Sequence, residues 1–144
     1  MAAAAGFAEA LRLAVATMDD KRRLMEGLRE QMLRGLEEQL GRSGFIVNGP
    51  SRPEDRLPHI LHVSFPGCAT ETLLMRLDLE GIAAASGSAC TSGSLELSHV
   101  LTAMGLPQEV AASAVRFSFG PATTFEEIAE TCEKVGTIVK RLRR

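Results

Sequence analysis

An apolar repeat of helical period runs through the first forty residues and limits what this chain can fold into. Charged residues fill the positions between the apolar ones, and Gly41 ends the segment. Thr17 followed by Asp19 is typical of a helix start, so we expect one bent helix or two. Apolar residues that recur three, four or seven positions apart form the face that must be buried: Phe7, Leu11, Ala14, Met18, Met25, Leu28, Met32 and Leu36.

Short apolar segments follow, and turn residues bound them. We expect strands at 45–48, 60–65, 82–85 and 114–119. Helices are expected at 70–77, 98–104 and 107–113, and a last helix begins at Thr124, whose hydroxyl and Glu127 form a capping box. The pattern predicts an α/β (α+β) two-layer domain. Its short mixed or antiparallel sheet of about four strands is covered by helices, and a long helix precedes it.

Composition bounds the class of protein. The 144 residues are 45% hydrophobic and 24% charged, which suits one compact domain. We expect 1–144 to be a single domain, with 1–42 as a linking helix or helix pair before the remainder, 43–144. The net charge of −2 provides no field for nucleic acid, and no apolar stretch approaches the length of a membrane span.

Cysteine usage favours a reducing compartment. The three cysteines are widely spaced and form no CxxC pair, so neither a disulfide framework nor a zinc site is expected. The N-terminus has no basic region of the kind that opens a signal peptide, and a cytoplasmic location is the expectation. No histidine or carboxylate spacing indicates a metal: His59, His62 and His99 are expected in packing or surface roles.

Cys90 is the first candidate for chemistry. It lies in a loop, 86–94, in which seven of nine residues are Ser, Thr or Gly. Such neighbours indicate an exposed sulfur on a mobile loop, although an incidental loop cysteine has the same pattern. Cys132 falls on the apolar face of the last helix, where core packing is expected. Cys68 follows Pro66–Gly67, at a turn where we expect access but no group that stabilises a thiolate.

Arg116 is the second candidate. The period of a strand places it on one face with Ala114 and Ser118, and the bulky Val115 and Phe117 on the other. Small neighbours leave room for a bidentate partner such as a carboxylate. The alternative is a charge on an edge strand that discourages aggregation.

Three segments resemble one family. Ser86–Leu101 is similar to the active-site loop of the NifS/IscS-like cysteine desulfurases, pyridoxal-phosphate enzymes of the class V aminotransferase family. Leu57–Phe65 resembles their LPNxLNVSF strand, and Val115–Gly120 with the threonines at 123 and 124 resembles IRFSLGxxTT. Leu97 replaces the usual proline, and Pro121 a common basic residue. The fold implied is the small domain of a fold-type I enzyme.

The resemblance implies a reaction and roles for two residues. In that family a loop cysteine attacks the sulfur of L-cysteine, L-alanine leaves, and the enzyme persulfide passes to a scaffold or acceptor protein for iron-sulfur cluster assembly and other sulfur-transfer pathways. Cys90 matches the nucleophile, and Arg116 matches the arginine that holds the substrate carboxylate. The resemblance also implies a homodimeric full-length parent.

The cofactor lysine of the family has no counterpart here. That lysine lies in a His-Lys motif of a larger N-terminal domain, whereas Lys21, Lys134 and Lys140 do not follow a histidine. We therefore expect the small C-terminal domain, as an excised fragment or a truncated gene, with pyridoxal phosphate only in the parent and no cofactor-binding residue in this chain. The chain alone is expected to be inactive.

Three other functions stay open. The chain could be a non-enzymatic sulfur carrier that accepts persulfide on Cys90, or a module that pairs with a full-length desulfurase. A selenocysteine lyase, a relative, is the third reading. Without the large domain that the resemblance implies, the N-terminal helix is expected to leave an apolar stripe bare, with self-association or disorder of the helix as the result: Phe7, Leu11, Met18, Met25 and Met32.

Overall fold

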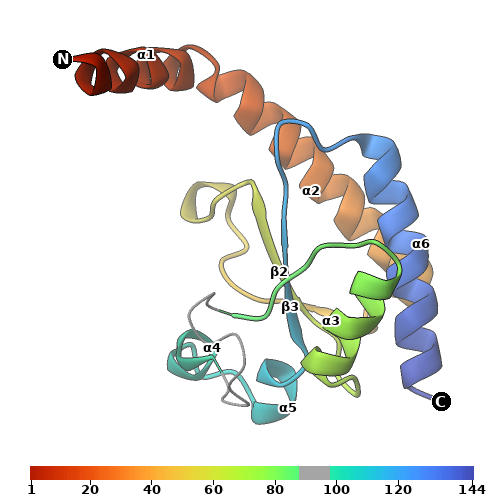
Figure 1. The fold of residues 1–144 in the computed structure, drawn as a ribbon. Coiled ribbons are helices and arrows are strands. Elements are labelled where there is room, and N and C mark those ends of the chain that lie inside the picture. The colour runs from red at the N-terminus through yellow and green to blue at the C-terminus, as the bar shows by residue number, and fades with distance from the viewer. Residues whose placement is uncertain (88–97) are drawn as a thin grey trace.

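Helices pack against one face of a small antiparallel sheet in the computed structural model, which describes residues 1–87 and 98–144 (Figure 1). Two helices come first and one long helix comes last. The sheet and the shorter helices lie between them in sequence. The elements are α1 (Ala2–Ala16), α2 (Met18–Leu40), β1 (Ile46–Val47), the 3-10 helix η1 (Pro53–Asp55), β2 (Ile60–Ser64), α3 (Thr70–Leu79), α4 (His99–Ala103), α5 (Gln108–Ala111), β3 (Ala114–Ser118) and α6 (Phe125–Leu142).

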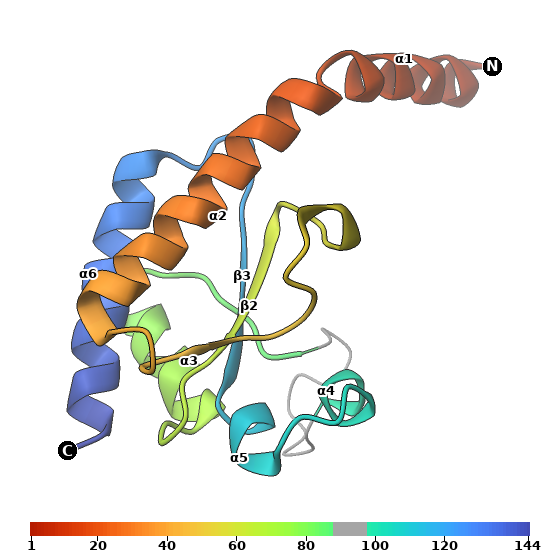
Figure 2. The ribbon, with the colours of Figure 1, turned by 180° about the vertical axis from the view of Figure 1, so that it is seen from behind.

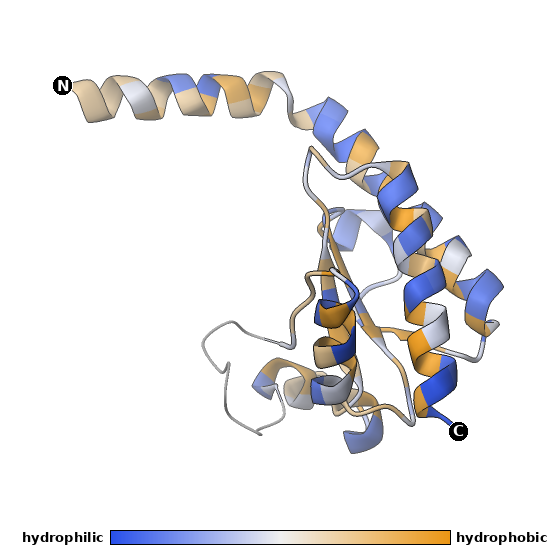
Figure 3. Ribbon diagram, turned by 45° about the vertical axis from the view of Figure 1, so that its right-hand side comes forward, coloured by the Kyte–Doolittle hydropathy of each residue, from blue (hydrophilic) through white to orange (hydrophobic). Residues whose placement is uncertain are grey.

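The N-terminal segment is two helices, one of the two expected forms, and the break falls at Thr17. The Thr17 hydroxyl donates to the Leu13 carbonyl at 2.9 Å, so it closes α1 rather than capping α2. No residue of α1 is buried, and this helix extends away from the rest of the molecule (Figure 2). Figure 3 shows apolar residues along it.

The expected bare stripe is wrong in its C-terminal part. Phe7, Leu11 and Met18 are exposed, but Met25 is partly covered and Met32 is fully buried. The reason is that α2 lies along α6 and turns its apolar face into the core (Figure 1). The exposed stripe is therefore confined to α1 and the start of α2.

The sheet has the order β1-β2-β3 with antiparallel pairing throughout. The strand expected at 82–85 reduces to a single bridge, in which Ala85 pairs with Arg116. The amide of Ile82 donates to the Leu77 carbonyl at 2.9 Å and closes the end of α3, so it is not available to a strand ladder. The predicted α/β class is confirmed, with three strands among the described residues.

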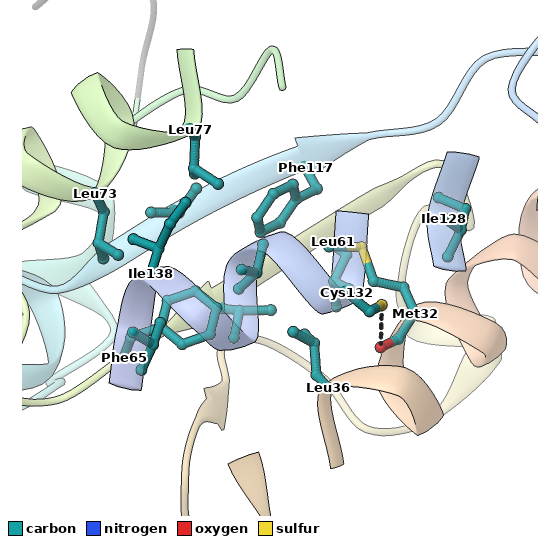
Figure 4. Packing of buried hydrophobic residues seen from close by; sticks show 14 of the residues in the cluster. Met32, Leu36, Leu61, Phe65, Leu73, Leu77, Phe117, Ile128, Cys132 and Ile138 are labelled. Atoms are coloured by element: carbon teal, nitrogen blue, oxygen red, sulfur yellow. Dashed lines mark hydrogen bonds between the residues drawn. The ribbon is translucent and has the colours of Figure 1, made fainter. Parts of the chain in front are cut away.

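The core lies between the sheet and the helices α2, α3 and α6 (Figure 4). Hydrophobic and hydrophilic residues alternate along α6, which has one buried face (Figure 3). The expected capping box starts this helix: the Glu127 amide donates to the Thr124 hydroxyl at 3.1 Å, and the Thr124 amide donates to the Glu127 carboxylate at 2.8 Å. Leu142, at the end of this helix, is partly buried against the core.

Glycines let α2 and α6 approach closely. A Cβ atom at Gly35 would lie 2.7 Å from the Cys132 sulfur, and one at Gly136 would lie 2.7 Å from Cβ of Gln39. The Cys132 thiol itself is 3.5 Å from the Met32 carbonyl, to which it donates. These two helices cover one face of the sheet, and Arg116 lies on the other face.

Within the described ranges, no helix combines the length and apolar character that a bilayer crossing requires.

Candidate functional site

Arg116 lies in the middle of β3 on the sheet face that points away from the core. Its neighbours Val115 and Phe117 are buried in the core, so strand alternation turns the guanidinium to the opposite face. The Arg116 backbone bonds to Ala85 in both directions, with N···O distances of 2.7 and 3.1 Å. Its Nη1 donates to the Gly87 carbonyl at 2.8 Å. The side chain is half-buried and is held in one direction by this bond.

Gly87 brings the chain on either side of residues 88–97 together. Its φ is +47°, a conformation that favours glycine, and a Cβ there would lie 3.0 Å from Cβ of Ser98. The two ends of the segment therefore meet at the carbonyl that accepts from Arg116. Cys90 itself lies outside the described residues.

His62 is opposite Arg116 in the β2–β3 register. Its Nδ1 is 3.0 Å from Nδ2 of Asn48, which also donates to the Ser64 hydroxyl at 2.7 Å. Burial lowers the pKa of His62, and the positive charge of Arg116 lowers it further. An Nδ1 atom that accepts from an amide leaves the ring proton on Nε2. His62 is partly buried, which is consistent with the expected packing role, and its neutral ring lies beside Arg116.

The other two thiols are buried. Cys132 is 3% exposed, and burial, with the charges of Glu38 and Glu133, raises its pKa to about 11. Core packing was the expectation for Cys132, and it is confirmed.

The expected accessible turn at Cys68 is wrong, because this residue is 5% exposed. The end of the last helix covers the turn, where Arg143 Nε donates to the Pro66 carbonyl at 3.0 Å. Arg143 also stabilises the Cys68 thiolate, contrary to expectation, yet burial outweighs it and raises the pKa of that thiol.

Sequence reasoning missed a basic cluster beside His62. Arg29 of α2 is almost fully buried, and its Nη1 donates to the Ile60 carbonyl at 2.6 Å. Arg56, which follows η1, lines the same pocket, as does Asn48. The available signal was helical spacing, because Arg29 directly follows Leu28 and precedes Met32 by three positions on the buried side of the helix.

Known proteins match the chain over most of its length. The sequence profile of the family described as aminotransferase class-V matches residues 1–130. The chain is 38% identical over 138 residues to a cysteine desulfurase IscS of Clostridium botulinum, covering 96% of this chain and 34% of that protein. It is 41% identical over 138 residues to a cysteine desulfurase IscS of Vibrio vulnificus, covering 96% and 32%.

Solved structures agree with this relation. A NifS-like protein superposes with a TM-score of 0.75 at 30% identity, over 93% of this chain and 32% of that one. The NifS-like protein from Rickettsia africae gives a TM-score of 0.75 at 25% identity, over 94% and 34%. The chain belongs to the aminotransferase class-V family. It spans about a third of the length of the curated relatives it matches.

The lysines of this chain do not fit a pyridoxal-phosphate Schiff base. Such a lysine needs a lowered pKa inside a pocket. Lys134 instead pairs with Glu130 at 2.6 Å, which raises its pKa, and donates to the Glu80 carbonyl at 3.0 Å. Lys140 and Lys21 are exposed on helices. No step through the cofactor is therefore assigned to residues of this chain.

Proposed function

We propose that this chain is the C-terminal part of a cysteine desulfurase. The overall change is L-cysteine plus an enzyme thiol giving L-alanine plus an enzyme persulfide. The Cβ–S bond of L-cysteine breaks, and an S–S bond to the enzyme thiol forms. The electron pair of the broken bond stays on Cβ, which takes up the proton that the enzyme thiol gives up, so atoms and electrons balance without an added oxidant. The persulfide then serves iron-sulfur cluster assembly and related pathways through an acceptor protein.

Arg116 carries the proposal as the anchor of the substrate carboxylate. Small side chains flank it on its face of the sheet, its half-buried guanidinium has one bond to a backbone carbonyl, and its other N–H groups are free of any carboxylate among the described residues. A planar guanidinium in this position can donate two parallel hydrogen bonds to one carboxylate. The carboxylate of L-cysteine is such a ligand.

Cys90 is proposed as the sulfur acceptor. It is three residues along the chain from Gly87, and three residues span at most about 11 Å. The thiol therefore belongs to a segment that begins at the carbonyl bound by Arg116. The burial of Cys68 and Cys132 supports this assignment, because a nucleophile must be reached by substrate and then by an acceptor.

Pyridoxal phosphate is proposed for the parent protein, where a lysine outside this chain would hold it. This cofactor supplies the electron sink that such reactions on amino acids need. The present chain contributes the anchor and the thiol.

A sulfur carrier is the second candidate for the chain by itself, and the engaged or exposed state of its lysines favours it. A carrier needs Cys90 but neither Arg116 nor a cofactor. The two functions therefore differ in what Arg116 does.

The deciding experiment uses the parent protein with the Cys90→Ser and Arg116→Gln substitutions. Cys90→Ser is expected to abolish sulfur transfer while leaving the cofactor spectrum unchanged. Arg116→Gln is expected to raise KM for L-cysteine. Cys68→Ala is the matched control and should keep sulfur transfer. A Cys90→Ser protein that still transfers sulfur would overturn the proposal, and an unchanged KM in Arg116→Gln would remove Arg116 as the anchor of the substrate carboxylate.

A further inference from the structure

A small pocket lies between α2, the chain after β1, and β2. Its volume is about 180 Å³. Residues from three parts of the chain line it: α2, the connection between β1 and β2, and β2 itself. Its polar lining is Arg29, Arg56, Asn48 and His62, and Leu57 and Ile60 form apolar walls.

Arg29 is the buried charge of this pocket. It is 4% exposed, its Nη1 donates to the Ile60 carbonyl at 2.6 Å, and its Nε has no hydrogen-bond partner in the described part of the chain. A buried charged donor without an acceptor is costly, and native structures usually satisfy it. The described residues therefore leave two buried polar atoms at this pocket without a partner, the donor Nε of Arg29 and the acceptor Oδ1 of Asn48.

Arg56 adds a second positive charge. Burial lowers the pKa of Arg29, and the charge of Arg56 lowers it further, so the two guanidinium groups repel each other. Neither of them forms an ion pair with an acidic side chain among residues 1–87 and 98–144. Glu54 and Asp55, the acidic residues next to Arg56 in sequence, pair with Arg52, and the charge of Arg56 contributes to the lowered pKa of Glu54.

Asn48 and His62 form a fixed wall. The amide nitrogen of Asn48 donates to His62 Nδ1 at 3.0 Å and to the Ser64 hydroxyl at 2.7 Å. These bonds hold Asn48 at 9% exposure and tie the wall to β2. The pocket is thus built by buried, hydrogen-bonded side chains and not by surface residues alone.

We propose that this pocket binds the carboxylate of a small organic acid. Arg29 and Arg56 each donate one Nη1 bond to a backbone carbonyl, of Ile60 and of Ser51, and neither forms an ion pair with a carboxylate among the described residues. Their remaining N–H groups are of the kind that a carboxylate binds. The apolar walls suit a short hydrocarbon chain attached to it. The volume is below the range of ordinary ligand pockets, which excludes nucleotides and other large anions. The proposal is independent of the sulfur chemistry, since it can be measured on this chain without L-cysteine or cofactor.

The experiment is a titration of the ¹⁵N-labelled chain with sodium acetate, at constant ionic strength with sodium chloride as the balancing salt. The readouts are the Nε–Hε resonances of the arginines and the thermal midpoint. Acetate should shift the Arg29 resonance saturably and raise the midpoint, because a ligand of the folded state stabilises it. Arg56→Gln should weaken acetate binding about tenfold, which corresponds to the loss of one charge-assisted hydrogen bond. Arg52→Gln, a matched arginine already paired with Glu54, should leave the affinity unchanged.

Three outcomes would overturn the proposal. The first is that acetate has no effect beyond that of chloride, which would mean the pocket holds water only. The second is that the Arg56→Gln and Arg52→Gln chains bind acetate equally well. The third is that inorganic phosphate binds more tightly than acetate, which would replace the carboxylate by a phosphate. Because neither variant alters the buried Arg29, loss of folding does not obscure the result.

Discussion

His62 and Arg116 lie directly opposite each other on neighbouring strands, on the face of the sheet that points away from the core. The pair places an imidazole beside a guanidinium. Burial and this positive charge both lower the pKa of His62, so the ring is neutral where an exposed histidine begins to take up a proton. The neutral His62 ring therefore adds no second positive charge beside Arg116.

The pH dependence of stability follows from this pair. In the unfolded chain the pKa of His62 is about 6.5, which is above its pKa in the folded chain. As the pH falls through about 6.5, the unfolded state binds a proton that the folded state does not yet bind, so the free energy of unfolding decreases. Urea unfolding between pH 7.5 and pH 5 measures the effect, which should be smaller in His62→Asn. Equal slopes for both chains would contradict the assignment.

The same pair predicts a change in titration. Removing the positive charge in Arg116→Gln should raise the pKa of His62, because one of its two lowering causes is gone. The shift of the His62 ring resonances with pH measures it. Arg52→Gln is the control, since Arg52 pairs with Glu54 and does not contribute to the His62 shift. A titration midpoint that stays the same in Arg116→Gln would show that burial alone acts.

The contact between α2 and α6 predicts that alanine at Gly35 destabilises the fold. Alanine improves helix propensity by up to about 1 kcal/mol, but its Cβ would clash with Cys132, and overpacking costs about 1–3 kcal/mol. We expect a net loss of about 1 kcal/mol in urea unfolding. Gly6→Ala is the matched control, because nothing lies within 4 Å of a Cβ there. That variant should not lower the free energy of unfolding, and the prediction fails if both variants behave alike.

The capping box predicts a local cost at Thr124. Thr124→Ala removes the acceptor of the Glu127 amide and should cost about 1 kcal/mol of stability. Thr137→Ala is the control within the same helix, because Thr137 is exposed and donates only to a carbonyl already within the helix, that of Glu133. It should be neutral or slightly stabilising. Thermal or urea unfolding of the two variants compares them, and equal losses would contradict the role of the cap.

The elements that depend on local sequence could be predicted, and those that depend on contacts between distant residues could not. The cap at Thr124 and the two faces of β3 follow from residue type and period, whereas the residues around Thr17 left one bent helix and two helices equally open. The 82–85 strand was overestimated because Ile82 bonds back to Leu77. The burial of Cys68 depends on Arg143, 75 positions away, and no local pattern indicates it. The pocket of Arg29 depends on bringing α2 to Asn48 and Arg56, which again needs the fold.

The last prediction concerns the order in which the three thiols react. Reaction rate follows the fraction of thiolate and the access of the reagent. Cys132 is buried with its pKa raised to about 11, and Cys68 is buried with its pKa raised despite Arg143. Limiting iodoacetamide at pH 7.5 should therefore label Cys90 before either of them. Peptide mass spectrometry measures the order.

Two variants make the order a strict test. Cys90→Ser should lose the fast phase of labelling and keep only slow labelling, limited by opening of the fold. Arg143→Lys should speed labelling of Cys68, because it keeps a positive charge near the thiol but cannot make both bonds, to the Pro66 and Gly44 carbonyls, that hold the turn over that thiol closed. This gain should not extend to Cys132, which is covered by α2 through the Met32 carbonyl. First labelling at Cys132, or a fast phase that survives in Cys90→Ser, would assign the reactive sulfur to another residue and remove the support for Cys90 as the acceptor.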